Sequence, residues 1–146
     1  MEKGGRLMAY WLFKSEPDVF GWDDLVAKGE QGEEWDGVRN YQARNMMRAM
    51  AVGDLGLFYH SNVGKEAVGI CQVIALAHPD STSADPKWEC VDIKAVRKLP
   101  RAVSLEEAKA EPRLADMVLV NNTRLSVQPV SDAEWSVIME LSGDQG

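Results

Sequence analysis

The end of the first apolar segment carries side chains that could do acid–base chemistry. Lys14 and Glu16 flank Ser15 in the sequence LFKSEP, and a lysine beside a carboxylate can pass protons to and from a bound substrate. An ordinary surface ion pair would use the same residues. If the protein is an enzyme, Lys14 and Glu16 are therefore the predicted catalytic residues. Otherwise no catalytic residue is predicted.

Patterns for a nucleophile, a metal or a cofactor are weak in the rest of the chain. His60 and Ser61 could serve Cys71 as base and partner, but nothing in their spacing brings the three together. Cys71 also lies in an apolar segment, which is typical of a buried structural cysteine. The two histidines and two cysteines lack the paired spacing of zinc sites. We therefore expect no metal, and the absence of glycine-rich phosphate-binding motifs predicts no cofactor.

Two tryptophans in turn-forming stretches favour recognition of a flat ligand. Trp35 stands in EEWDG and Trp88 in DPKWE, so either ring can stand at the rim of a cavity. An aromatic ring stacks on a nucleobase with about 1–3 kcal/mol per stack, and small polar groups can read the edge of an unstacked base. The alternative is that all five tryptophans fill the core. The apolar patterns around Trp11, Trp22 and Trp135 indicate this for those three.

Short strands and helices must position these residues. Apolar and alternating patterns predict strands over residues 9–15, 55–61, 67–77, 88–99 and 124–130. The second and third of them are expected to pair antiparallel across a turn, and Pro129 places the last one at a sheet edge. Because the strands come mostly in adjacent pairs, we expect an α+β fold with a mixed, strongly bent sheet or small barrel, not a doubly wound parallel sheet.

Helices are expected between these strands. Helical spacing predicts them over residues 21–28, with Gly29 past the helix end, and over 41–52, and residues 31–37 are expected to form a loop. Ser104 and Ser131 each begin a capping box that opens a further helix. The segment 116–122 fits either a strand or a short apolar helix.

Length and composition set the class of protein. The chain has 146 residues, of which 45% are hydrophobic and 27% charged, as in an ordinary globular domain. No apolar run is long enough to cross a bilayer, and the first residues lack the apolar segment of a signal peptide. We therefore expect a cytoplasmic protein with reduced cysteines and no membrane partner.

The charge distribution limits how the protein could bind a polyanion. A net charge of −7 argues against tight, nonspecific binding, which depends on many contacts from lysine and arginine to phosphate. Yet Arg39, Arg44 and Arg48 follow one another without an intervening acid, as do the four bases of residues 94–101. Such clusters are commonly solvated surface, and a local binding face is the alternative.

Six segments, in order, resemble the EVE domain family. They are YWLFKSEP (10–17), WDGVRNYQARN (35–45), GDLGLFYHSN (53–62), VGICQV (68–73), DPKWECVDIKAVRKL (85–99) and RLSVQPV (124–130). The resemblance runs from about residue 9 to about residue 141, and WDGVRNYQARN is long and specific. It implies an N-terminal extension at residues 1–8, an EVE domain over 9–142 and a short tail over 143–146.

The resemblance implies both a fold and a function. The fold would be PUA-like: a mixed β pseudo-barrel of five to six strands with short helices packed around it. EVE domains resemble YTH domains, which hold N-methyladenine of RNA in an aromatic cage, and they are regarded as readers of modified bases in DNA or RNA. A monomer that binds such a nucleic acid, or a modified nucleoside, is therefore expected. The alternative is an ASCH-like enzyme that hydrolyses or processes a modified nucleoside.

The family also implies a ligand-binding set. Trp35 would match one wall of the aromatic cage and Trp88 the second wall, where a methyl group offers about 1–3 kcal/mol of selectivity. Polar groups would surround the ligand from the ends of three strands. Those groups are Lys14, Ser15, Ser61, Asn62, Arg124 and Ser126.

Residues around the first cage tryptophan have a less definite role. Arg39, Asn40 and Tyr41 follow the Asp-Gly-Val that comes after Trp35, and they either brace its turn or face the ligand. Together with the arginines that follow along the chain, Arg39 also suits phosphates on either side of a flipped nucleotide.

Overall fold

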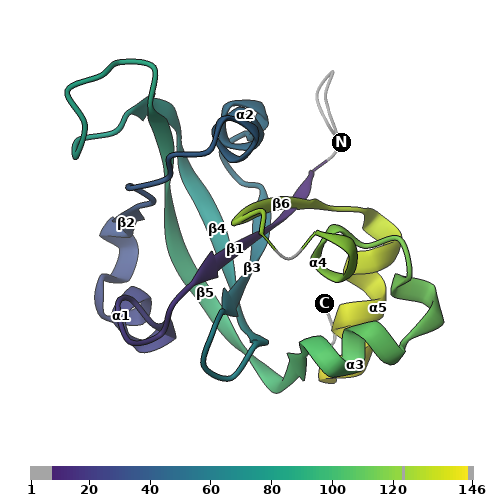
Figure 1. The fold of residues 1–146 in the computed structure, drawn as a ribbon. Helices are drawn as coiled ribbons and strands as arrows, with labels where there is room; N and C mark the ends of the chain where they lie inside the picture. The colour runs from purple at the N-terminus through teal and green to yellow at the C-terminus, as the bar shows by residue number, and fades with distance from the viewer. Residues whose placement is uncertain (1–7, 123, 145–146) are drawn as a thin grey trace.

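One six-stranded mixed sheet forms the frame of the computed structural model, which describes residues 8–122 and 124–144 (Figure 1). The strand order is β2-β5-β4-β3-β1-β6. Strands β1 and β3 run parallel, and the other paired strands run antiparallel. The strands are β1 (Tyr10–Ser15), β2 (Glu33–Glu34), β3 (Leu55–His60), β4 (Glu66–Pro79), β5 (Glu89–Ser104) and β6 (Val127–Val130).

Short helices cover the two faces of this sheet. The Ser104 and Ser131 side chains accept hydrogen bonds from the third residue of the helices that they open, so both predicted capping boxes are confirmed. None of the described helices is both long and apolar enough for a membrane span. The helices are α1 (Trp22–Ala27), η1 (Gly29–Gln31), α2 (Tyr41–Ala49), α3 (Leu105–Ala110), η2 (Pro112–Leu114), α4 (Val118–Asn121) and α5 (Asp132–Ser142).

The strands divide their side chains between two hydrophobic cores, because successive side chains of a strand point to opposite faces. Trp11 and Phe13 of β1 enter one core, which α1 and α2 cover. Leu12 between them enters the other, which α3, α4 and α5 cover on the lower right of Figure 1. Trp22 lies in the first core and Trp135 in the second, as the sequence predicts.

The sheet is bent where β4 and β5 pair. Their register shifts at several places between Ala67 and His78, and such irregularities bend strands and increase their twist. The edge strands β2 and β6 are not paired with each other in the described residues, so the bent sheet stays open. The predicted α+β class and the mixed, bent sheet of five to six strands with short helices are therefore confirmed.

Several element boundaries differ from those predicted. The expected loop over 31–37 contains the two-residue strand β2, which pairs with β5. Helix α2 ends at Ala49, not at residue 52, because Ala51 N–H donates to the Asp54 carboxylate in a turn (3.0 Å). Strand β5 continues beyond residue 99 through Pro100, since its pairing with β4 extends to Ser104. The segment that fitted either a strand or a helix forms α4.

Candidate functional site

A cavity of about 880 Å³ opens where the ends of β1 and β3 meet the turn after β2. Its volume lies within the roughly 300–1,000 Å³ of ordinary ligand sites. The lining comes from segments far apart in the chain, which the parallel pairing of β1 and β3 and the bond from Lys14 N–H to Ser126 C=O (2.9 Å) hold side by side. The predicted residues among this lining are Lys14, Ser15, Trp35, Arg39, Asn40, Ser61, Asn62, Arg124 and Ser126.

Trp35 is both a core residue and a wall of the cavity. Its side chain is only 8% exposed, and the rings of Phe13, Phe20 and Phe58 meet it edge-on at centroid distances of 5.6, 6.2 and 5.7 Å. Its backbone N–H donates to Val91 C=O at 2.8 Å. Since three rings and a backbone bond fix its position, the part of Trp35 that lines the cavity is a pre-formed surface.

Asp80 holds the turn that follows Trp35. Its buried carboxylate accepts hydrogen bonds from Gly37 N–H (2.8 Å) and from the Arg39 guanidinium (3.0 Å). It also accepts from the backbone N–H (2.7 Å) and hydroxyl (2.6 Å) of Thr82. Gly37 adopts a positive φ of 80°, which favours glycine. Although burial acts to raise the pKa of Asp80, these hydrogen bonds outweigh it and lower that pKa to about 2.

Sequence reasoning missed Asp80, although the signal was present. Asp80 begins an Asp-Ser-Thr run in a polar, turn-forming segment, where an aspartate commonly caps its own turn. Nothing along the chain shows that this carboxylate also reaches Gly37 and Arg39, more than 40 residues earlier. That contact depends on β2, which places the Trp35 turn beside the β4–β5 loop.

The ends of β1 and β3 present polar groups to the cavity. Ser15 Oγ donates to Phe20 C=O (2.6 Å), and Ser61 N–H donates to Ser15 C=O (2.8 Å), so the two strand ends are held together. Within residues 8–122 and 124–144, the side chains of Ser61, Asn62, Arg124 and Ser126 make no hydrogen bond or ion pair. Their polar atoms are therefore available to a ligand.

The cavity contains charges of both signs. Its acids are Glu16, Glu33, Glu34 and Asp36, and its bases are Lys14, Arg39 and Arg124. Burial raises the pKa of Asp36, and the nearby carboxylates of Asp80 and Glu34 raise it further. Burial lowers the pKa of Lys14. The site can thus both donate and accept hydrogen bonds, and it is not a purely cationic groove.

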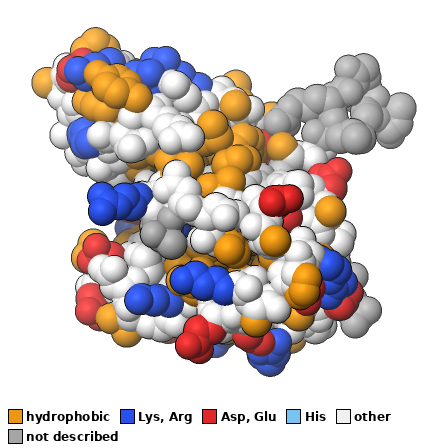
Figure 2. All heavy atoms as spheres, turned by 45° about the vertical axis from the view of Figure 1, so that its right-hand side comes forward, with side chains coloured by type: hydrophobic (Ala, Val, Ile, Leu, Met, Phe, Trp, Pro, Cys, Tyr) orange, Lys and Arg blue, Asp and Glu red, His pale blue; other side chains and the backbone are white. Residues whose placement is uncertain are grey.

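Trp88 and Tyr41 lie outside the lining of this cavity. They stack on each other with ring centroids 5.0 Å apart, and Tyr41 is 53% exposed. The guanidinium of Arg44 lies 4.9 Å from the Tyr41 ring, and Lys87 Nζ lies 5.6 Å from both rings. We call Tyr41, Arg44, Lys87 and Trp88 the aromatic–cation patch. Figure 2 shows basic side chains beside hydrophobic ones at the top left, the height at which Figure 1 places the β4–β5 loop and α2.

The structure therefore places Trp88 over α2 and not across the cavity from Trp35. A turn bond from Trp88 N–H to Asp85 C=O (3.2 Å) folds the end of the β4–β5 loop back, and Arg44 donates to Lys87 C=O (2.9 Å) from the helix. Apolar side chains that do line the cavity with Trp35 are Val19, Phe20 and Val38. Two of the three arginines predicted for phosphates already have carboxylate partners: Arg39 pairs with Asp80 and Arg48 with Glu89.

The alternative nucleophile does not assemble. Cys71 is fully buried, its thiol faces Gly56 C=O (3.5 Å), and burial raises its pKa strongly, so it is unreactive. His60 accepts a hydrogen bond from Trp22 N–H through Nε2 (3.1 Å), and burial lowers the His60 pKa. The other cysteine, Cys90, lies near His78 and Glu34, a cluster considered below.

Comparisons with known proteins agree with this architecture. A sequence model of the EVE domain matches residues 9–141. Mouse thymocyte nuclear protein 1 is 38% identical over 170 residues, which cover 94% of this chain and 75% of that protein. A crystal structure of an Agrobacterium tumefaciens protein is 56% identical with a TM-score of 0.93, covering 94% of this chain and 96% of that one.

A human relative has been solved with nucleic acid. The human THYN1 protein, in complex with DNA containing 5-methylcytosine, is 34% identical with a TM-score of 0.84, covering 94% of this chain and 99% of that one. A more distant likeness concerns the fold alone: the YTH domain of Zygosaccharomyces rouxii MRB1 is 17% identical with a TM-score of 0.56, covering 92% and 86% of the two chains. The fold is thus PUA-like, and the chain belongs to the EVE domain family.

Proposed function

We propose that the protein is a reader of modified nucleobases, and that the cavity holds one such base flipped out of its strand. The observation that carries the proposal is the position of Trp35, which three aromatic neighbours hold in place and which lines a cavity of about 880 Å³. The human relative crystallised with 5-methylcytosine DNA makes that base in DNA the first candidate ligand.

The walls of the cavity suit a base that carries an extra methyl group. Trp35 and Phe20 offer flat apolar surfaces, and Val38 adds an aliphatic one. A methyl group that fits such a wall contributes about 1–3 kcal/mol, which gives selectivity over the unmethylated base without absolute discrimination. An ordered cavity also keeps the entropic cost of binding low, because its walls are already in place.

The polar groups of the cavity suit the edge of a pyrimidine. The exocyclic amino group of cytosine donates hydrogen bonds, and carboxylates accept them. Asp36 offers such an acceptor, and Asn62 and Ser126 can serve the ring nitrogen and carbonyl oxygen. Arg124, which lines the same cavity and has no partner in the described part of the chain, suits the phosphate of the flipped nucleotide.

The aromatic–cation patch extends this site along the strand. Arg39 connects the two, because it lines the cavity and its guanidinium lies 5.6 Å from the Trp88 ring. A neighbouring nucleobase can stack on the exposed pair of Tyr41 and Trp88, which contributes about 1–3 kcal/mol of binding free energy per stack. The cationic side chains of Arg44 and Lys87 lie nearby and suit the phosphates of that nucleotide. In this proposal Trp88 contacts a flanking nucleotide and not the flipped base.

Binding to matched oligonucleotides tests the proposal. Two DNA strands that differ by one 5-methylcytosine are titrated into the protein, and affinity is measured by fluorescence anisotropy. We expect tighter binding of the methylated strand, weakened several-fold by Arg124→Gln and by Asn62→Gly. Glycine is chosen because Asn62 has a positive φ of 65° that alanine would not tolerate well. Equal affinity for both strands, unaffected by these variants, would overturn the proposal for this base.

One observation favours an ASCH-like enzyme as a second candidate. Lys14 and Glu16, the predicted acid–base pair, both line the cavity, and burial lowers the pKa of Lys14 toward the range of a useful base. Incubation with methylated and acylated nucleosides, followed by chromatography, tests it. Product formation that Lys14→Met abolishes would support the enzyme. Unchanged nucleosides across the panel would leave the reader as the function.

A further inference from the structure

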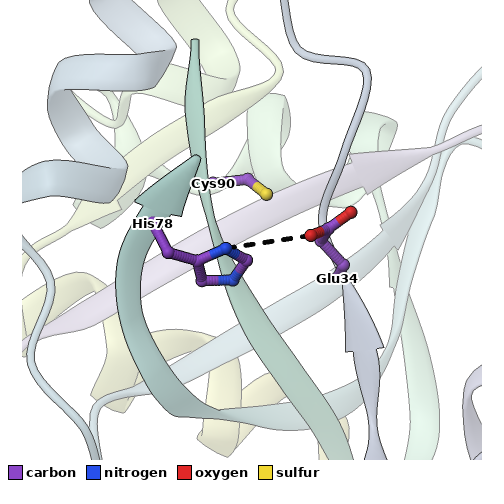
Figure 3. A group of neighbouring side chains, drawn as sticks. All are labelled: Glu34, His78 and Cys90. Atoms are coloured by element: carbon purple, nitrogen blue, oxygen red, sulfur yellow. Dashed lines mark ion pairs between the residues drawn. The ribbon is translucent and has the colours of Figure 1, made fainter. Parts of the chain in front are cut away.

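Three side chains from three different strands converge beside the cavity (Figure 3). Glu34 comes from β2, His78 from β4 and Cys90 from β5, and one possible ligand atom from each lies within 4.8 Å of the others. Pairing of β4 with β5 sets His78 opposite Cys90, and pairing of β2 with β5 brings Glu34 alongside. His78 Nδ1 and Glu34 Oε2 are 3.8 Å apart. The cluster is thus built by the sheet and not by a flexible loop.

The imidazole of His78 is already oriented as a metal ligand usually is. Its Nε2 lies 2.8 Å from Asp92 Oδ1, so Asp92 fixes the ring and directs Nδ1 toward Glu34. A carboxylate that accepts from the far nitrogen of a coordinating histidine is the ordinary outer partner in metal sites. Nδ1 also lies 3.0 Å from Pro79 C=O, a contact that it would exchange for the metal.

The charges around the cluster favour a cation. Four carboxylates lie close enough to Cys90 to act on its thiol, and each adds negative charge around the cluster. They belong to Glu34, Asp36, Asp80 and Asp92. Arg39, which acts on the nearby Asp36, is already paired with Asp80. Cys90 itself is fully buried beneath the partly exposed side chains of Glu34 and His78, so an ion would enter between those two.

We propose that Glu34, His78 and Cys90 bind a divalent transition metal of the zinc class, with water in a fourth position. Imidazole, thiolate and carboxylate together suit zinc and its near relatives, whereas calcium and magnesium prefer oxygen ligands alone. The three ligand atoms already lie within 4.8 Å of one another. Small movements of their side chains would therefore place each atom about 2.0–2.3 Å from a shared metal ion. Binding releases the thiol proton of Cys90 and any proton on His78 Nδ1 to the solvent.

The spacing of these residues explains why the sequence predicted no metal. Forty-four positions separate Glu34 from His78, and twelve separate His78 from Cys90, so no short motif joins them. The ion would join β2 to β4 and β5. Because Trp35 directly follows Glu34, the bound ion would stabilise the strand that positions Trp35 in the cavity wall. This role is structural and does not depend on the proposed recognition of a base.

Cobalt provides a direct spectroscopic probe. The protein is stripped with a chelator and titrated with Co²⁺, whose bond to a thiolate gives a charge-transfer band in the near ultraviolet. We expect one equivalent to produce this band in the wild type and in the control Cys71→Ser, which changes the other buried cysteine. Cys90→Ser should lose the band, and Asp92→Asn should weaken binding 10–100-fold, as loss of an outer carboxylate typically does.

Thermal unfolding with Zn²⁺ adds a second readout, because a ligand that binds only the folded state raises Tm. We expect Zn²⁺ to raise the Tm of the wild type and of Cys71→Ser by several degrees. Glu34→Gln, which changes a partly exposed side chain and should fold normally, is expected to reduce that rise. A cobalt spectrum that Cys90→Ser leaves unchanged, or no binding of either metal at micromolar concentration, would overturn the proposal.

Discussion

Trp35 and Trp88 stand in similar turn-forming stretches of the sequence, yet they occupy opposite kinds of surroundings. Trp35 is 8% exposed, is held by three aromatic rings and lines the cavity. Trp88 stacks on the exposed ring of Tyr41, among basic side chains. In the proposed reader, Trp35 therefore serves as a fixed wall that gives selectivity, whereas Trp88 is part of an exposed surface that adds affinity.

Truncation of the two tryptophans should separate these roles most sharply. Trp35→Ala removes a core side chain, so the free energy of unfolding should fall by roughly 3–5 kcal/mol and binding should be lost. Trp88→Ala removes one of the two rings of a surface stack, and we expect the free energy of unfolding to fall by about 1 kcal/mol. Urea unfolding followed by circular dichroism measures both. Equal losses in the two variants would contradict the contrast between wall and surface.

Asp80 allows the rigidity of the wall to be tested by pH. Its pKa is about 2 in the folded protein against 3.8 for a free side chain, so it contributes roughly 2 kcal/mol of stability. Because the folded pKa is the lower one, this stability is present above about pH 4 and is lost as pH falls toward 2.

The variant Asp80→Asn should therefore be less stable than the wild type at neutral pH, and the gap should narrow between pH 4 and 2. Unfolding in urea at a series of pH values measures the gap. Asp85→Asn, an exposed change in the same loop, is the control and should have a much smaller effect. A gap between wild type and Asp80→Asn that stays constant down to pH 2 would show that Asp80 does not hold the turn through its charge.

The surface role of Trp88 predicts a loss of affinity without a loss of selectivity. Trp88→Ala should weaken binding of methylated and unmethylated DNA by a similar factor, about tenfold, which corresponds to 1–2 kcal/mol for one lost stack. Val96→Ala, which truncates an exposed apolar side chain on β5, is the control. If Trp88→Ala alone abolishes the difference in affinity between the methylated and unmethylated strands, Trp88 belongs to the aromatic cage.

Charge on the patch should have the smallest effect, visible mainly in the salt dependence. Arg44→Gln removes one cation that suits a phosphate, so the slope of log affinity against log salt should fall by about 1. Arg113→Gln should leave the slope unchanged, because Arg113 lies in η2 between α3 and α4, away from α2 and the β4–β5 loop (Figure 1), and pairs with Glu111 and Glu140. An unchanged slope in Arg44→Gln would mean that this arginine contacts no phosphate.

Local signals made much of the fold predictable. Capping boxes at Ser104 and Ser131 located two helices, because a serine and a glutamate three residues later satisfy each other's backbone groups. The apolar pattern of residues 9–15 predicted strand β1. Strand β2 was missed because its two residues have no period of their own, and their pairing with β5 is a long-range contact.

The candidate site was predictable only as far as the family resemblance extended. Trp35 and the ends of β1 and β3 were expected together, and the structure brings them to one cavity. The position of Trp88 depends on how the β4–β5 loop folds over α2, which no local pattern reveals. The same is true of Asp80 and of the Glu34, His78 and Cys90 cluster, whose members meet only through strand pairing.

The measurement that tests the central claim most directly is NMR of a DNA strand whose single 5-methylcytosine carries a ¹³C-labelled methyl group. On binding, we predict that the methyl resonance shifts upfield, because it lies against aromatic rings, and that it shows nuclear Overhauser contacts to the indole of Trp35. No such contact to Trp88 is predicted. A methyl resonance that does not move, or contacts to Trp88 in place of Trp35, would contradict the account.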